Sequence, residues 1–111
     1  MKKLPVRTFE LSDEAMKHLR YFSVYAQRII YDHMVAQLIE SDPEEQTAHK
    51  KPLKRTIPGA DWYLIIERWR SLYRVETSAG RTHSRVAVIG EKINNKLYVK
   101  GKEYIQWRSG A

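Results

Sequence analysis

The sequence has no cysteine, so a disulfide framework and thiolate chemistry are excluded. No run of apolar residues approaches the ~20 positions that a membrane-spanning helix needs. The first ten residues, MKKLPVRTFE, also lack the apolar core of a signal peptide, because Pro5, Arg7 and Glu10 interrupt it. These absences favour a cytoplasmic protein.

Motifs for several kinds of chemistry are missing as well. There is no phosphate-binding glycine loop, no nucleophile elbow and no pair of carboxylates placed for acid–base work. The four histidines, at positions 18, 33, 49 and 83, fall in different expected elements and lack the spacing of metal ligands. We therefore expect no bound metal and no small-molecule cofactor.

What the chain does have is the composition of one globular domain over residues 1–111. Hydrophobic residues make up 42% of it, and three Trp, seven Tyr and two Phe give twelve aromatic residues, which separates it from disordered tails. A chain of this length buries roughly two thirds of its unfolded surface. The chain is therefore long enough to form one hydrophobic core.

Charge is distributed unevenly along the chain. Residues 1–48 carry six Lys/Arg against eight Asp/Glu, a net charge of −2. Residues 49–111 carry fourteen against five, a net charge of +9. This segregation indicates either a nucleic acid or an acidic protein segment as partner of the C-terminal part, or simply a soluble basic protein.

The N-terminal third predicts a strand and two helices. Residues 4–10 alternate well enough for a first strand. Ser12 can cap a short helix that begins with two acidic residues and ends near Phe22. Ser23 can cap a longer helix that reaches about Ile39. The face of this helix expected to meet the sheet carries Ile30, Tyr31, Met34, Val35 and Leu38.

Residues 41–61 read as a polar connection, which is long for so small a domain. Its segment HKKPLKR, at 49–55, holds four positive charges in seven residues. A solvated charge run is one interpretation, and a basic segment that completes a binding surface is the other.

The stretch from 62 to 98 predicts consecutive antiparallel strands with two unlike faces. One face would hold the helices through Leu64, Ile66, Tyr73, Val75 and Val88. The other would offer to a target Arg70, Arg74, Lys92 and Tyr98. The predicted fold is therefore α+β, with an N-terminal strand and two helices packed on one face of a twisted antiparallel sheet of about four to five strands.

Three motifs follow this order of elements: HKKPLKR, RWRSLYRVE and VIGEKINNKLYVKGKEY. With them the chain resembles, over nearly its whole length, the RelE/ParE superfamily of bacterial toxins. The resemblance implies a type II toxin–antitoxin module, in which a cognate antitoxin wraps the toxin through a disordered, usually acidic segment. In the RelE branch the toxin is an mRNA interferase, an endoribonuclease that enters the ribosome, cleaves mRNA without metal or cofactor and inhibits translation.

The resemblance also implies site residues. Arg70 matches the arginine that opens the central strand motif of RelE-type toxins and can clamp a phosphate bidentately. Lys92 stands where these toxins have an arginine, and Tyr98 matches a tyrosine that can move a proton or stack on a base. These three are the candidate catalytic residues, although exposed arginines can merely solubilise a sheet and Tyr98 can be ordinary packing. The candidate RNA- or phosphate-binding residues are Lys50, Lys51, Lys54, Arg55 and Arg74.

One departure keeps other functions open. The RelE branch places two lysines on the strand before the central arginine, where this chain has Asp61 and Tyr63. Cations of the HKKPLKR segment would have to supply that charge. The alternatives are a ParE-type toxin directed at DNA gyrase, without nuclease activity, and a non-toxic relative that binds RNA or protein.

Overall fold

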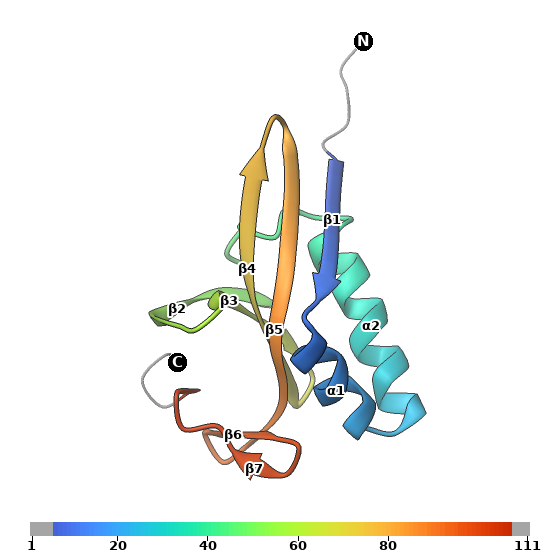
Figure 1. The fold of residues 1–111 in the computed structure, drawn as a ribbon, viewed down its shortest axis with the longest axis vertical. Coiled ribbons are helices and arrows are strands. Elements are labelled where there is room, and N and C mark those ends of the chain that lie inside the picture. The colour runs from blue at the N-terminus through green and yellow to red at the C-terminus, as the bar shows by residue number, and fades with distance from the viewer. Residues whose placement is uncertain (1–5, 108–111) are drawn as a thin grey trace.

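The computed structural model describes residues 6–107. Within these residues, two helices and seven strands follow one another (Figure 1). Their bounds in chain order are β1 (Val6–Leu11), α1 (Asp13–Tyr21), α2 (Val24–Leu38), β2 (Lys50–Ile57), β3 (Ala60–Ile66), β4 (Trp69–Ser78), β5 (Arg81–Ile93), β6 (Lys96–Val99) and β7 (Lys102–Glu103).

One sheet joins all seven of these strands. Six of them form antiparallel neighbours in the order β2-β3-β4-β5-β6-β7. β1 lies off this path and pairs in parallel with the first half of β5, while the last residues of β5 pair with β6. The long β5 therefore connects the N-terminal strand to the C-terminal hairpin (Figure 1).

Both helices begin where the sequence predicts. The Ser12 side chain accepts a hydrogen bond from the Ala15 backbone N–H at 3.1 Å, and Ser23 accepts one from Ala26 at 3.2 Å. Each bond satisfies a backbone donor of the first helical turn that has no partner within the helix. No helix in the described part of the chain is long and apolar enough to cross a membrane.

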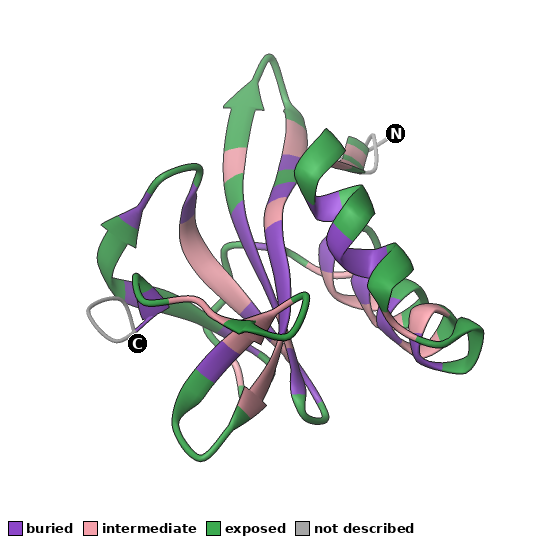
Figure 2. Cartoon of the chain, turned by 60° about the horizontal axis from the view of Figure 1, so that its bottom comes forward, coloured by how far each residue is buried: buried purple, intermediate pink, exposed green. Residues whose placement is uncertain are grey.

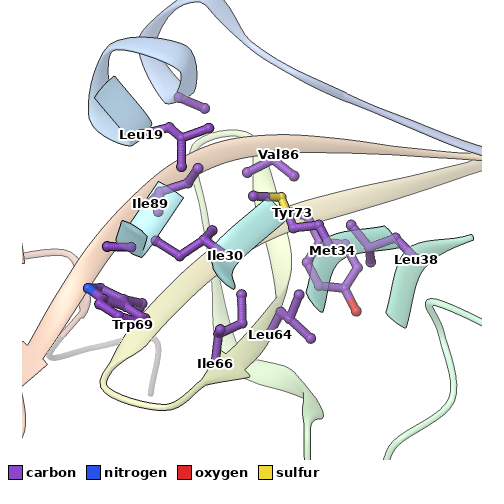
Figure 3. Packing of buried hydrophobic residues seen from close by; sticks show 12 residues of the cluster. Leu19, Ile30, Met34, Leu38, Leu64, Ile66, Trp69, Tyr73, Val86 and Ile89 are labelled. Atoms are coloured by element: carbon purple, nitrogen blue, oxygen red, sulfur yellow. The ribbon is translucent and has the colours of Figure 1, made fainter. Parts of the chain in front are cut away.

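The first core lies between the helices and one face of the sheet, the helix face (Figure 3). Ile30, Met34 and Leu38 of α2 are fully buried in this core. Residues four positions apart lie on one side of a helix, so all three face the sheet. Tyr31, which was expected on the same stripe, is 50% exposed. The sheet contributes Leu64, Ile66, Trp69, Tyr73, Val86 and Ile89.

A β-bulge in β5 divides the apolar residues of this strand between the two faces. Leu72 pairs with Val88 and Tyr73 pairs with Val86, so Ala87 is the extra residue. Val86 therefore faces the helices, whereas Val88 lies in a second core on the opposite face, the open face. The prediction that Val88 contacts the helices is wrong, because regular alternation gives no sign of the bulge.

The second core brings together strands that are distant in the sheet. Its buried members are Leu53, Ile57, Ala60, Leu72, Val88, Leu97 and Trp107. Tyr63 of β3 packs edge-on against Trp107, with ring centroids 5.1 Å apart. The four strand spacings from β3 to β7 would span about 19 Å in a flat sheet. The sheet therefore curls into a half-barrel around this core (Figure 2).

The predicted fold, with two helices on one face of a simple sheet of four to five strands, is thus wrong. The HKKPLKR segment, expected in a connection, belongs largely to strand β2. The buried residues of β2 are Lys50, Leu53 and Ile57, spaced three and four positions apart across a register shift, so they do not show the two-residue period of a strand. The curl also creates a second core to which neither helix contributes a buried residue.

His18 makes the stability of the fold sensitive to acid. Its Nδ1 accepts a hydrogen bond from the Ile89 backbone N–H at 3.2 Å, which requires the neutral ring on that side. Burial lowers the pKa of His18, Glu14 opposes this shift and Lys100 adds to it. The unfolded chain therefore takes up a proton as the pH falls below about 6.5, while the folded chain resists it.

We expect the free energy of unfolding to fall as the pH drops below about 6.5, by at most about 1.4 kcal/mol per pH unit from this one group. Urea unfolding at pH 7.5 and 5.5 measures the change. His18→Gln, whose amide oxygen can still accept the Ile89 bond, should show a smaller acid loss. The exposed His49→Gln serves as control, and an equal acid loss in both variants would contradict the assignment.

Candidate functional site

A cavity of about 410 Å³ lies on the open face, between the curled strands and the segment that follows β7. Side chains from β2, β3, β4 and β5 reach it, together with the β5–β6 turn. The lining residues are Lys51, Tyr63, Ile65, Arg70, Lys92, Asn95 and Trp107. Two of the three candidate catalytic residues, Arg70 and Lys92, therefore share one cavity.

Strand register explains why these side chains meet. Lys51 pairs with Tyr63, and Ile65 pairs with Arg70, and directly paired residues of antiparallel strands point to the same face. Lys92 pairs with Leu97, a member of the second core, so it too projects from the open face.

The β5–β6 turn presents Asn95 to the cavity. Only Asn94 and Asn95 separate the two strands, and both have positive φ, 50° and 67°. Two such residues are typical of a type I′ hairpin turn, a conformation that asparagine tolerates better than most residues.

The β3–β4 turn holds Arg70 in place. Its Nη1 donates to the backbone oxygens of Glu67 and Trp69, both at 2.8 Å. The backbone N–H of Lys92 donates to the Arg68 oxygen of the same turn at 2.7 Å. No described residue accepts a bond from Nε or Nη2 of Arg70. The guanidinium is therefore anchored along one edge and open along the other.

The cavity carries a concentrated positive charge. Burial lowers the pKa of Arg70, and the neighbouring Tyr63 opposes that shift; an arginine nevertheless stays protonated in proteins. Among residues 6–107, none of the ion pairs involves Lys51, Arg70 or Lys92. Three cations without an acidic side chain in the lining suit an anionic ligand.

Lys50 lies outside the cavity and has a structural role. It is 1% exposed, and its Nζ donates to Gln37 O at 3.1 Å, Ser41 Oγ at 2.6 Å and Asp42 O at 2.8 Å. Burial lowers the pKa of Lys50. The ammonium stabilises the carbonyl end of α2, which lacks a basic residue of its own in its last turn. The structure therefore does not bring Lys50 to the binding surface.

Three further predicted cations also lie outside this cavity. Lys54 and Arg55 are exposed on β2 but do not line it. Arg74 shares a face of β4 with Arg70, yet it lines a separate hollow of about 250 Å³ beside Asp61. It also forms an exposed ion pair with Glu76 at 3.8 Å.

Tyr98 faces away from Arg70 and Lys92. It pairs with Glu91 on β5, whereas the next position of β6, Leu97, pairs with Lys92. Because adjacent strand residues point to opposite faces, Tyr98 projects toward the helix face. The tyrosine among the lining residues of the cavity is Tyr63.

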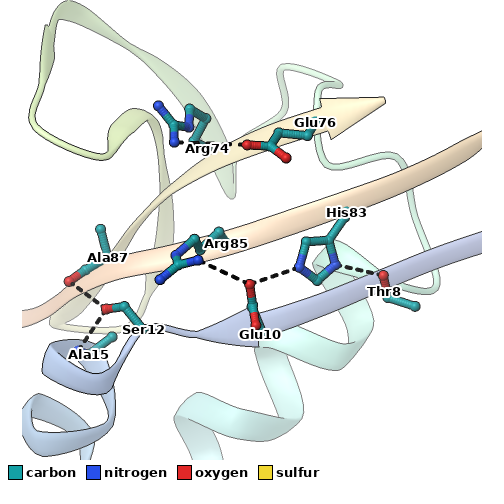
Figure 4. A network of polar contacts seen from close by, with 9 residues as sticks. All are labelled: Thr8, Glu10, Ser12, Ala15, Arg74, Glu76, His83, Arg85 and Ala87. Atoms are coloured by element: carbon teal, nitrogen blue, oxygen red, sulfur yellow. Dashed lines mark hydrogen bonds and ion pairs between the residues drawn. The ribbon is translucent and has the colours of Figure 1, made fainter. Parts of the chain in front are cut away.

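The other end of the open face is a polar network whose charges are largely matched (Figure 4). Glu10 of β1 accepts from Arg85 at 3.4 Å and lies 3.2 Å from His83 Nε2. The second ring nitrogen of His83 lies 2.7 Å from Thr8 Oγ1. His83 therefore links β1 to β5. The described residues contain no group of three or more acidic or histidine side chains placed to hold a metal ion.

No protein-family model matches the sequence, and no curated protein sequence matches it. Function is therefore inferred from the chemistry of the cavity and from the resemblance of the motifs.

Sequence reasoning missed two features of this site. In the sequence, Tyr63 stands out only as a departure from a lysine position, and nothing marks Asn95 as a site residue. The signal for Tyr63 was its place two residues before Ile65 on one strand face, opposite a lysine-rich segment. That signal required the pairing of β2 with β3, which the sequence did not reveal.

Proposed function

We propose that the chain is the toxin component of a type II toxin–antitoxin module of the RelE/ParE superfamily, a cytoplasmic mRNA interferase that inhibits translation. The observation that carries the proposal is the convergence of Lys51, Arg70 and Lys92 on one cavity without an acidic lining residue. A scissile phosphate, which gains negative charge in the transition state, is the kind of group that such a cavity stabilises.

The proposed reaction is attack of the RNA 2′-hydroxyl on the adjacent phosphorus, with loss of the 5′-oxygen of the next nucleotide. Arg70 would clamp the phosphate through its open edge, and Lys51 and Lys92 would balance the added charge. Lys51 would supply the charge that lysines at positions 61 and 63 provide in the RelE branch. A 2′,3′-cyclic phosphate would form, solvent would take up the proton of the attacking 2′-hydroxyl, and Tyr63, rather than Tyr98, would donate a proton to the leaving 5′-oxygen and regain it from solvent.

The ParE-type alternative also has an observation in its favour. Tyr98 lies on the opposite face from Arg70 and Lys92. The three catalytic residues implied by the RelE resemblance are therefore not all in one site. A gyrase-directed toxin would need the basic surface for binding only.

Induced expression of the chain in bacterial cells, with separate readouts for translation and replication, tests the proposal. We expect translation to stop first and new 5′ ends to appear in ribosome-bound mRNA. Purified chain that has been treated with EDTA and dialysed should still cleave mRNA on intact ribosomes. Co-expression of a small acidic or DNA-binding protein encoded beside this chain should restore growth.

Each other outcome selects an alternative. Intact mRNA with a DNA-damage response would replace the proposal by the gyrase-directed toxin. Normal growth, with RNA bound but not cut, would replace it by the non-toxic binding relative.

A further inference from the structure

The cavity has an aromatic wall as well as a cationic one. Lys51, Arg70 and Lys92 supply the charge, while Tyr63 and Trp107 supply flat apolar surface beside it. The volume of about 410 Å³ is in the range of sites for small organic ligands, ~300–1,000 Å³. A phosphate group alone would leave most of this space unfilled, so the ligand should carry a flat, largely apolar part next to its anionic part.

Tyr63 is the ring placed to contact that part. Trp107 is only 3% exposed and meets Tyr63 edge-on, with an interplanar angle of 80° and centroids 5.1 Å apart. The edge contact with Trp107 therefore fixes the orientation of Tyr63, which is half-buried and lines the cavity. A ring held in this way stacks on a ligand at little entropic cost.

The charged groups lie close to this ring. Lys51 is the direct cross-strand partner of Tyr63, which places their Cβ atoms about 5 Å apart. Arg70 is near enough to interact electrostatically with the Tyr63 phenol. A ligand with its ring on Tyr63 would thus have its anionic group within reach of Arg70 and Lys51. Asn95 adds an amide to the rim, with both donors and an acceptor for the polar edge of a base.

We infer that this cavity is a nucleotide subsite, in which Tyr63 stacks on one nucleobase while Arg70, Lys51 and Lys92 bind the adjacent phosphate. Tyr63 is in this role a positioning residue: it orients the nucleotide and does not itself need to move a proton. The inference rests on the proposed function for the RNA polymer to which the nucleotide belongs. Binding of a single nucleotide, however, involves neither ribosome nor cleavage.

The test is calorimetric titration of the purified chain with inorganic phosphate and with the four nucleoside 3′-monophosphates. We expect at least one nucleotide to bind about tenfold or more tightly than phosphate. Tyr63→Leu, which keeps an apolar contact with Trp107, should weaken that nucleotide about 5- to 100-fold, the size of one lost base stack. The same variant should leave phosphate binding within about twofold, and Tyr63→Phe should retain nucleotide binding.

Tyr25→Leu is the matched control, because Tyr25 is 75% exposed on α2, away from the cavity. The inference is overturned if phosphate and all nucleotides bind equally, if a folded Tyr63→Leu variant binds nucleotide normally, or if an oligoglutamate peptide binds where nucleotides do not. If expression of the chain stops translation but nucleotide binding does not depend on Tyr63, the nucleotide subsite is contradicted and the toxin proposal is not. If nucleotide binding depends on Tyr63 but the chain is not toxic, the toxin proposal is contradicted and the nucleotide subsite is not.

Discussion

Arg70→Ala is expected to relieve toxicity and to slow mRNA cleavage about 10²–10³-fold, the usual cost of removing one group that stabilises transition-state charge. The guanidinium lies in the cavity with two other cations, is anchored through Nη1 to Glu67 and Trp69, and has an open edge. Alanine removes both the charge and the bidentate geometry. Ribosome-bound mRNA cleavage by purified chain, timed by primer extension, gives the rate.

Arg70→Lys separates these two contributions. It keeps the positive charge but replaces the planar fork by a point charge, so we expect a rate between those of the wild type and the alanine variant. Arg81→Ala is the control, since Arg81 is exposed at the far end of the β4–β5 hairpin. Circular dichroism checks folding, because the alanine variant also loses two turn hydrogen bonds. Full cleavage by a folded Arg70→Ala chain would remove Arg70 from the proposed site.

Local patterns predicted the helices because their signals are contained in adjacent residues. Ser12 and Ser23 each cap a helix through a backbone N–H three positions ahead, and no distant contact is needed to recognise this. The curl of the sheet depends instead on contacts such as Tyr63 with Trp107, which are 44 positions apart. Periodicity carries no information about such pairs. The strand count was therefore wrong while the helix starts were confirmed.

Strand alternation predicts which site residues share a face of one strand, but not which strands lie side by side. The expectation that Arg70 and Arg74 share a face of β4 is met, because the bulge lies in β5 and leaves β4 regular. Lys50 and Lys51 are adjacent and identical in type, yet one is 1% exposed and the other lines the cavity. Only the register of β2 on β3 distinguishes them, and a one-residue slip would exchange their roles.

The bulge at Ala87 precedes a close approach of β6 at Gly90. After the bulge, Val88, Gly90 and Lys92 lie on the open face of β5. A Cβ at Gly90 would lie 2.7 Å from the Tyr98 backbone oxygen and 3.0 Å from a Leu97 side-chain carbon. Gly90 therefore allows β6 to approach β5 closely and leaves the position paired with Arg70 free of a side chain. Bulges and tight glycine contacts of this kind often re-aim side chains at functional sites.

Tyr73→Ala is expected to lower the free energy of unfolding by about 3–5 kcal/mol, as for other large buried aromatic side chains. Tyr73 is fully buried in the first core, and its ring stacks on Trp62 with centroids 6.4 Å apart. Against a total stability of about 5–15 kcal/mol for a domain, this loss would leave the variant partly unfolded. Urea unfolding followed by tryptophan fluorescence measures it.

Tyr73→Phe isolates the hydroxyl, which donates to the backbone oxygen of Pro43 at 2.6 Å and fastens the loop after α2 to β4. Phenylalanine keeps the ring but leaves that buried oxygen without its donor, so we expect a loss of about 1–3 kcal/mol. Burial raises the pKa of Tyr73, so the unfolded chain releases this proton first and the wild type should lose stability above about pH 10. The phenylalanine variant should lack this part of the alkaline loss. An equal alkaline loss in both chains, or no cost at neutral pH, would contradict this role of the Tyr73 hydroxyl.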